Sequence, residues 1–374
     1  MVRLALVLAA VMIVAETVGA EQRGERRRVG LDEQAHLTQL VDAAAEGKHT
    51  EGNAWLAWAP HFLRGPDRKT YIPFTLKIEE APGAFKSAAM YVRVAPRGDL
   101  GRAGKKADGV QNVLGVANGE MPVNSPERRQ GSGAPTATDA SLMLRSLTAK
   151  NTGTGYPYEA AYGVETAAAQ DGRMSTLQSG LALAPGEYDL YIALLERDRK
   201  GEKKWAVLKQ PITVPDLATP ALRVSSIILA DRVEPITKPV PPAEQPRRPY
   251  VLGASELVPA LDDELRTDET LHVAFVIYDA LPDRAGMPDV RVEYRLFQQN
   301  FSGERLLGAT PPQAFDPSTL PAGFDLRTGQ QLAAMQSLPL STYKPGTYRL
   351  AIRVTDNRTG GTAEESLRFV VTAG

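Results

Sequence analysis

The hydrophobic pattern predicts one helix near the start of the chain. Apolar residues recur at helical spacing between residues 31 and 47, and Gly47 follows where such a helix would end. The apolar positions are Leu37, Leu40, Val41 and Ala44. We expect this short amphipathic helix to pack on the domain that follows it; binding of a partner helix is the alternative.

From Trp55 onward the hydrophobic period changes to two, which is typical of a strand with one buried face. Residues 71–78 and 89–95 alternate in this way, and Pro73 indicates a sheet edge or a bulge. Strands, not helices, are therefore expected to build the first domain.

Residues 96–155 interrupt this pattern. The segment contains no aromatic residue, is rich in glycine and proline, and is apolar only around Leu142, Leu144 and Leu147. Such a composition buries too little surface to offset the entropy of ordering. We predict a long flexible insertion in the first domain that acts as a linker, with a binding loop as the alternative.

Two later segments repeat one pattern. Residues 183–194 and 343–354 both place a Pro-Gly pair before alternating apolar positions, and Leu177-Gln-Ser179 is echoed by Met335-Gln-Ser337. An internal duplication explains both similarities. Each copy predicts a hairpin at the end of a β-sandwich.

The repeated pattern also contains a tyrosine two residues after each Pro-Gly pair. Such a tyrosine resembles a tyrosine corner, in which the phenol bonds to upstream backbone and stabilises the crossing between sheets. We assign structural roles to six residues, which are Pro185, Gly186, Tyr188, Pro345, Gly346 and Tyr348.

The predicted fold class is all-β, with two tandem immunoglobulin-like β-sandwich domains and a short N-terminal helix. Domain 1 is expected over residues 50–216 and domain 2 over residues 220–374, because Pro215 to Pro220 separates the two copies. The proline-rich segment 235–249 is expected to be a stiff connection between strands of domain 2.

Three segments resemble a known group of proteins. The hairpin that turns at Thr359-Gly360, residues 69–76 and residues 226–231 resemble exported bacterial proteins with tandem immunoglobulin-like modules. They are similar also to the module beside the GWxTD motif, although that motif is absent here. The resemblance covers about residues 55–95 and 175–374, and it implies a fold without implying any catalytic residue.

The N-terminus indicates export. Arg3 precedes an apolar run from Leu4 to Ala15, and small residues end the segment at Ala20. This pattern predicts a signal peptide over residues 1–20, because the run is too short to span a bilayer as a helix. The mature chain is therefore expected in the periplasm or outside the cell, without a stable membrane anchor.

Composition excludes several kinds of chemistry. The chain of 374 residues balances 43 Lys and Arg against 44 Asp and Glu, which argues against nucleic acid as a partner. It has no cysteine, which excludes thiolate metal sites, cysteine nucleophiles and disulfides. No phosphate-binding loop, nucleophile elbow or His-Glu-x-x-His motif occurs.

Two clusters of possible metal ligands have unsuitable spacings. His36, His49 and His61, with Glu51, match no zinc or iron site that we can defend. The acidic residues between 262 and 269 lack the alternating carboxylates of a calcium loop. We therefore predict no metal, no cofactor and no catalytic residue.

Trp55 and Trp58 are the candidate ligand contacts, as a platform for stacking a sugar ring. Residues three apart in a strand face opposite sides, so core packing is the favoured role for both. The sequence thus predicts a non-enzymatic exported structural or protein-interaction module of the bacterial envelope, with another envelope protein as its partner. The alternatives are a carbohydrate-binding module and a hydrolase.

Overall fold

The structure is a computed structural model. It describes residues 29–48, 52, 54–80, 87–98, 155–168, 174–197, 204–237, 248–252, 254–260, 262–301 and 303–374. The predicted signal peptide and nearly all of the predicted insertion over residues 96–155 lie outside these residues, as do His49, Glu51 and most of the proline-rich segment.

Helix α2 spans Leu31–Ala45 and begins where the hydrophobic pattern placed it. Glu33 closes its first turn by accepting a hydrogen bond from the Gly30 N–H at 3.0 Å, and Gly47 follows with a φ of 75°. Its buried Leu37 and Val41 pack on a sheet of the first sandwich. The predicted N-terminal helix is confirmed.

The first sandwich consists of two antiparallel sheets. The β3 sheet has the order β1-β3-β7-β6, with β2 beside β3, and the β8 sheet has the order β5-β4-β8-β9. Side chains from both sheets form one apolar core between them. The strands are β1 Ala54–Pro60, β2 Leu63–Arg64, β3 Thr70–Glu80, β4 Ser87–Pro96, β5 Tyr158–Glu165, β6 Ala167–Ala168, β7 Met174–Leu183, β8 Gly186–Glu196 and β9 Trp205–Val214.

The second sandwich also has two sheets around one core. The β15 sheet has the order β10-β15-β11-β13-β12, and β19 also pairs with β15. The β20 sheet has the order β14-β21-β20-β16-β17, and β18 also pairs with β16. The strands are β10 Arg223–Val224, β11 Ile228–Pro235, β12 Val251–Leu252, β13 Ser255–Pro259, β14 Glu264–Arg266, β15 Thr270–Tyr278, β16 Val290–Asn300, β17 Gly303–Ala309, β18 Gln313–Phe315, β19 Leu332–Pro339, β20 Gly346–Asp356 and β21 Thr362–Thr372.

The two sandwiches share one core topology. The order β1-β3-β7 in the first corresponds to β11-β15-β19 in the second, and β9-β8-β4-β5 corresponds to β21-β20-β16-β17. The repeated sequence segments occupy equivalent strands, since Tyr188 begins the inward row of β8 and Tyr348 that of β20. The similarity between the copies therefore extends from the hairpins to the whole sandwich.

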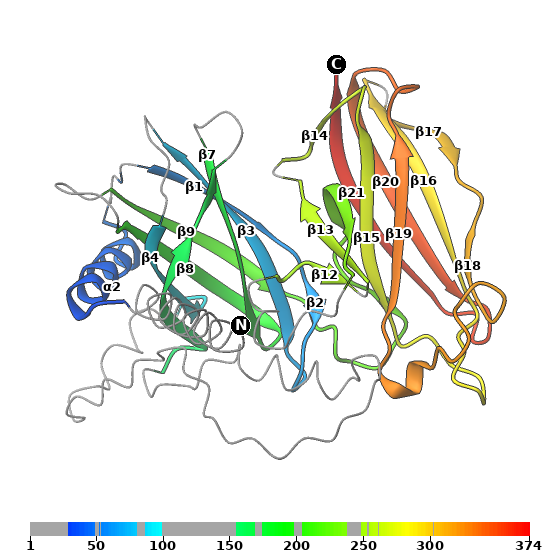
Figure 1. Cartoon of the computed structure of the whole chain (residues 1–374), viewed down its shortest axis with the longest axis horizontal. Helices are drawn as coiled ribbons and strands as arrows, with labels where there is room; N and C mark the ends of the chain where they lie inside the picture. The colour runs from blue at the N-terminus through cyan, green and yellow to red at the C-terminus, as the bar shows by residue number, and fades with distance from the viewer. Residues whose placement is uncertain are drawn as a thin grey trace, which may run out of the picture.

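Strands dominate the described residues, whose helices are α2 and the short 3-10 helix η3 Leu326–Thr328. Figure 1 shows the two sandwiches side by side, with α2 on the side of the first that faces away from the second. The predicted all-β class, built from β-sandwiches, is confirmed.

One detail of the sequence reasoning is wrong. Pro73 lies in β3, a central strand between β1 and β7, and its pairing with β7 runs without a register shift, so it marks neither a sheet edge nor a bulge. Proline is tolerated here because Pro73 faces the gap between β1 and β2, where no strand pairing requires its missing N–H. At this gap the Pro73 carbonyl accepts a hydrogen bond from the His61 N–H at 2.8 Å.

Candidate functional site

The junction between the two sandwiches brings together residues that are far apart in the sequence. An apolar cluster here joins the outer face of the β3 sheet to the outer face of the β15 sheet. Its buried members are Leu63, Tyr71, Leu217, Ile228, Ala230, Tyr250, Leu252, Leu257, Ala274, Val276 and Tyr278. Burial of this cluster holds the two sandwiches against each other.

Residues 61–64, which comprise the link after β1 and strand β2, make several of the polar contacts at the junction. The Phe62 N–H donates to Ser226 Oγ at 2.9 Å, and the Phe62 carbonyl accepts from the Ser226 N–H at 3.0 Å. The Arg64 N–H donates to the Tyr278 hydroxyl at 2.9 Å. These backbone contacts give the junction one defined register.

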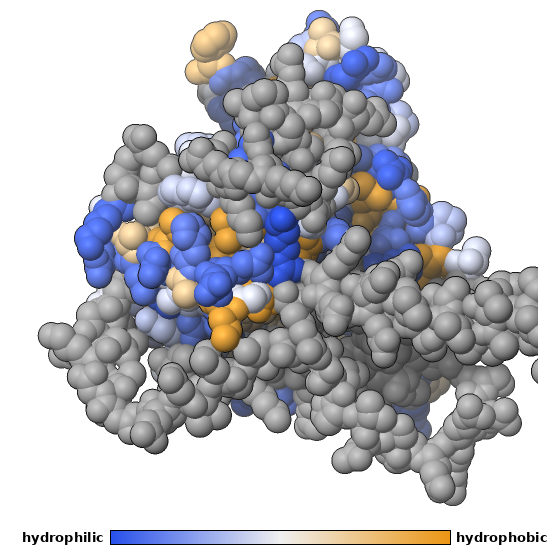
Figure 2. Space-filling view, turned by 60° about the vertical axis from the view of Figure 1, so that its left-hand side comes forward, coloured by the Kyte–Doolittle hydropathy of each residue, from blue (hydrophilic) through white to orange (hydrophobic). Residues whose placement is uncertain are grey.

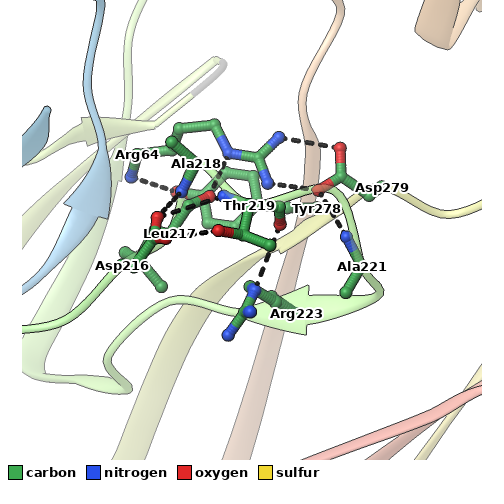
Figure 3. A network of polar contacts seen from close by, with 9 residues as sticks. All are labelled: Arg64, Asp216, Leu217, Ala218, Thr219, Ala221, Arg223, Tyr278 and Asp279. Atoms are coloured by element: carbon green, nitrogen blue, oxygen red, sulfur yellow. Dashed lines mark hydrogen bonds and ion pairs between the residues drawn. The ribbon is translucent and has the colours of Figure 1, made fainter. Parts of the chain in front are cut away.

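The Arg64 side chain forms the centre of the polar network in Figure 3. Its guanidinium pairs with both carboxylate oxygens of Asp279, one at 2.9 Å, and its Nε donates to the Leu217 carbonyl at 2.6 Å. The guanidinium also lies 4.5 Å from the centre of the Tyr278 ring. A two-point ion pair with a stacked aromatic ring fixes orientation as well as distance.

The segment between the sandwiches is itself held by a carboxylate. Asp216 Oδ1 accepts hydrogen bonds from the N–H groups of Ala218 at 2.9 Å and Thr219 at 3.1 Å. The hydroxyl of Thr219 donates to the same carboxylate, and these bonds lower the pKa of Asp216. The link is therefore an ordered turn that continues the network of Figure 3.

His61 lies at the same junction. Its Nδ1 is 3.0 Å from the Tyr250 hydroxyl, and the two rings meet edge to face with centres 5.4 Å apart. Burial lowers the pKa of His61 to about 4, because the low-dielectric surroundings disfavour the charged imidazole. At neutral pH the interface therefore contains a neutral histidine.

A second polar cluster lies beneath α2. The guanidinium of Arg93, a residue only 5% exposed, donates to Asp42 Oδ1 at 2.5 Å and to the Tyr91 hydroxyl at 2.7 Å. The Tyr91 hydroxyl in turn donates to Glu159, and the Tyr156 ring lies 4.6 Å from the guanidinium. This cluster joins the helix to the outer face of the β8 sheet.

The residues assigned structural roles lie at equivalent places in the two sandwiches. The Tyr188 hydroxyl donates to the Ala184 carbonyl at 3.0 Å, and the Tyr348 hydroxyl donates to the Lys344 carbonyl at 2.6 Å. The prolines of the Pro-Gly pairs, Pro185 and Pro345, directly precede strands β8 and β20, which begin at Gly186 and Gly346.

The candidate ligand contacts do not form one surface. Trp55 is 71% exposed, whereas Trp58 packs against the core of the first sandwich with its ring 6.1 Å from that of Phe74. The two side chains leave β1 on opposite faces, as strand alternation requires. Trp55 therefore stands apart from Trp58.

The candidate metal ligands are likewise separated. His36 is exposed on α2, and His61 contacts Tyr250 at the junction. In the acidic segment, Asp262 accepts from the Glu264 N–H and Asp268 pairs with Arg266. No group of three or more metal-binding side chains occurs among the described residues.

Sequence reasoning missed the junction. Arg64 and Asp279 are 215 positions apart, and neither belongs to a motif. The only local sign was an acidic residue directly after the apolar strand that ends at Tyr278. Such a residue is commonplace at the end of a strand, so it could not identify its partner.

Exposed apolar side chains are scattered over the described surface. They are Leu31, Trp55, Leu281, Phe301 and Leu306. Figure 2 shows mainly hydrophilic residues on the described part of one face, with hydrophobic residues between them. Two of the five, Phe301 and Leu306, belong to a single hairpin.

Comparison with known proteins finds weak similarity among solved structures. No family model and no curated protein matches the chain. Among solved structures, the chain is similar to red sea bream transglutaminase, with 9% sequence identity and a TM-score of 0.19. The alignment covers 88% of this chain and 33% of the transglutaminase, so the chain spans about a third of that protein's length.

This similarity corrects one expectation from the sequence. We expected a protein without enzymatic activity, and the matched transglutaminase is an enzyme. The expectation therefore no longer stands, although a TM-score of 0.19 assigns no reaction to this chain.

None of the helices in the described part of the chain is long and apolar enough to cross a bilayer.

Proposed function

We propose that this protein is an exported protein-interaction module of the bacterial envelope, in which two immunoglobulin-like sandwiches act as one rigid unit. The observation that supports this most is the junction, where an apolar cluster and the Arg64–Asp279 pair hold both sandwiches in one orientation. A fixed orientation keeps sheet faces and hairpins from both halves at constant distances, which lowers the entropy cost of binding a partner.

The export part of this proposal is supported by the N-terminal sequence. Positively charged Arg3, the apolar run that follows and the small residues before Glu21 fit a signal peptide. The absence of cysteine requires an exported chain to gain stability from apolar burial, and each sandwich has a large core of this kind.

Cross-linking in native envelopes tests the proposed function. The mature chain, residues 21–374, should form a reproducible cross-link to the same envelope protein in independent preparations. Arg64→Ala should reduce the yield, because loss of the pair with Asp279 lets the sandwiches reorient. The matched control is Arg232→Ala, which removes an exposed ion pair within β11.

Two results would contradict the proposal. One is repeated failure to recover any partner with a folded protein. The other is equal recovery of the partner by Arg64→Ala when small-angle scattering shows that its junction is loosened. That result would mean that binding does not depend on the rigid unit.

A further inference from the structure

The four sheets differ in what covers their outer faces. Helix α2 covers the β8 sheet, and the β3 and β15 sheets bury part of their outer faces against each other. Among the described residues, no apolar cluster covers the outer face of the β20 sheet, and Figure 1 shows no helix over it. Within the described part of the chain, the outer face of this sheet is therefore unpartnered.

The open face carries an excess of positive charge. Along β16, β20 and β21 the inward, core-facing positions alternate with outward positions, and about half of the outward positions are charged. The charged side chains, including one from β17, are Arg291, Glu293, Arg295, Glu304, Arg349, Arg353, Glu364 and Arg368. On these four strands five arginines against three glutamates leave two positive charges, and the charges of Glu264 and Arg266 on the edge strand β14 cancel; the whole chain has a net charge of -1.

The glutamates on this face are shared between arginines. Glu293 pairs with Arg291 at 3.5 Å and with Arg295 at 2.9 Å. Glu304 pairs with Arg349 at 2.6 Å and with Arg368 at 3.9 Å, and the hydrogen bond from Arg349 lowers the pKa of Glu304. Each guanidinium has five N–H donors. The three glutamates therefore do not use all the donors of the five arginines, and some remain available for further acceptors.

An apolar patch adjoins these arginines. Phe297 lies opposite Leu306 on the neighbouring strand, and the Arg349 guanidinium lies 4.3 Å from the Phe297 ring centre. Leu306 is 53% exposed, and Phe301 is fully exposed in the turn of the same hairpin. Aromatic residues and arginine are enriched where protein interfaces are buried, so this patch has the composition of a binding surface.

We propose that the outer face of the β20 sheet binds an acidic protein surface. The partner presents carboxylates to Arg291, Arg295 and Arg353 and places an apolar side chain against Phe297 and Leu306. The proposal rests on the proposed function and names its surface. Charge complementarity selects an acidic partner, because a basic one would meet an excess of guanidinium groups.

A defined peptide pair tests this surface with the mature full chain. The probe is a short peptide that alternates glutamate and leucine, and its control has lysine in place of glutamate. We expect binding of the acidic peptide alone, measured by calorimetry, and weaker binding at high salt because rim charges are screened.

Variants locate the site. The double variant Arg295→Glu and Arg353→Glu should weaken binding by about tenfold or more, since two attractive pairs become repulsive. The control Arg97→Glu and Arg232→Glu reverses two charges elsewhere and should leave binding unchanged. A melting curve establishes whether each variant is folded. If the double glutamate variant is unfolded, the double variant Arg295→Gln and Arg353→Gln takes its place.

The outcomes separate this inference from the proposed function. Equal binding of both peptides, or unchanged binding of the acidic peptide by the double variant at Arg295 and Arg353, would overturn the assignment of this face as the binding surface. If the envelope cross-linking fails while the acidic peptide still binds in this pattern, the proposed function falls and the surface assignment is supported.

Discussion

At the scale of single residues, the two sandwiches use the same contact in the same place. Tyr188 and Tyr348 each bond to the carbonyl four residues upstream, directly before the strand that contains the tyrosine. Tyr348 also stacks on Phe369, with ring centres 5.6 Å apart. The hydroxyl ties the turn to the strand, while the ring belongs to the core.

Substitution of each hydroxyl tests this role. Tyr188→Phe and Tyr348→Phe should each lower the free energy of unfolding by about 1 kcal/mol, because each removes the hydrogen bond from the tyrosine hydroxyl to the upstream carbonyl. The control is Tyr191→Phe, because the Tyr191 hydroxyl is buried and has no hydrogen-bond partner among the described residues. This change should be neutral or stabilising, and equal losses in urea denaturation for all three variants would contradict the argument.

Gly180 provides a second residue-scale prediction. A Cβ at this position would lie 2.6 Å from the Tyr71 hydroxyl, which is buried at the junction. Gly180→Ala should therefore lower the free energy of unfolding by about 1–3 kcal/mol. Gly308→Ala is the control, since it meets open space, and a thermal melt that shifts equally in both variants would show that the close approach is unimportant.

At the scale of elements, α2 is held to the first sandwich by charge as well as by apolar packing. Arg93 lies on β4 beneath the helix and contacts both Asp42 on the helix and Glu159 on β5. Glu33, in the first turn, pairs with Arg197 at 2.7 Å. The helix is therefore anchored near both of its ends.

Arg93→Ala should destabilise the protein strongly, by about 3–5 kcal/mol, because it leaves the carboxylate of Glu159 buried without its cation. Arg97→Ala, which breaks a half-exposed pair with Glu187, should cost about 0–1 kcal/mol. Hydrogen exchange in α2 should rise only in the first variant. Unchanged exchange there would mean that apolar contacts alone hold the helix.

Most elements were predictable because their patterns are local. Helix α2 and the hairpin strands β8 and β20 follow directly from apolar spacing and Pro-Gly turns. Pro73 misled because strand position depends on neighbours far along the chain. The candidate site was not predictable, since Arg64 and Asp279 meet only after both sandwiches have folded.

At the scale of the whole molecule, the junction responds to acid through His61. Its pKa in the folded protein is about 4, below the ordinary value of about 6.5 that applies when the chain is unfolded. Above about pH 6.5 His61 is neutral in both the folded and the unfolded state, and the protein keeps its full stability with respect to this residue. As the pH falls from about 6.5 to about 4, the unfolded state takes up the proton first, and stability is lost.

The loss attributable to His61 should reach at most about 3 kcal/mol, from a difference of about 2.5 pKa units. The measurement compares the free energy of unfolding of the wild-type protein with that of His61→Phe at each pH. The contribution of the carboxylates, which titrate in both proteins, then cancels. His36→Phe is the control on the exposed face of α2. A pH dependence that is identical in the normal protein and in His61→Phe would exclude this role.

The sequence by itself determined the sandwich class, the helix and the repeated hairpins, because these depend on alternation and turn residues within a few positions. Only the tertiary structure decided where the sandwiches touch and which sheet face stays open. Those features arise from contacts such as Arg64 with Asp279 and Phe62 with Ser226, between residues more than 160 positions apart. Packing of whole sheets selects such pairs, so no local pattern records them.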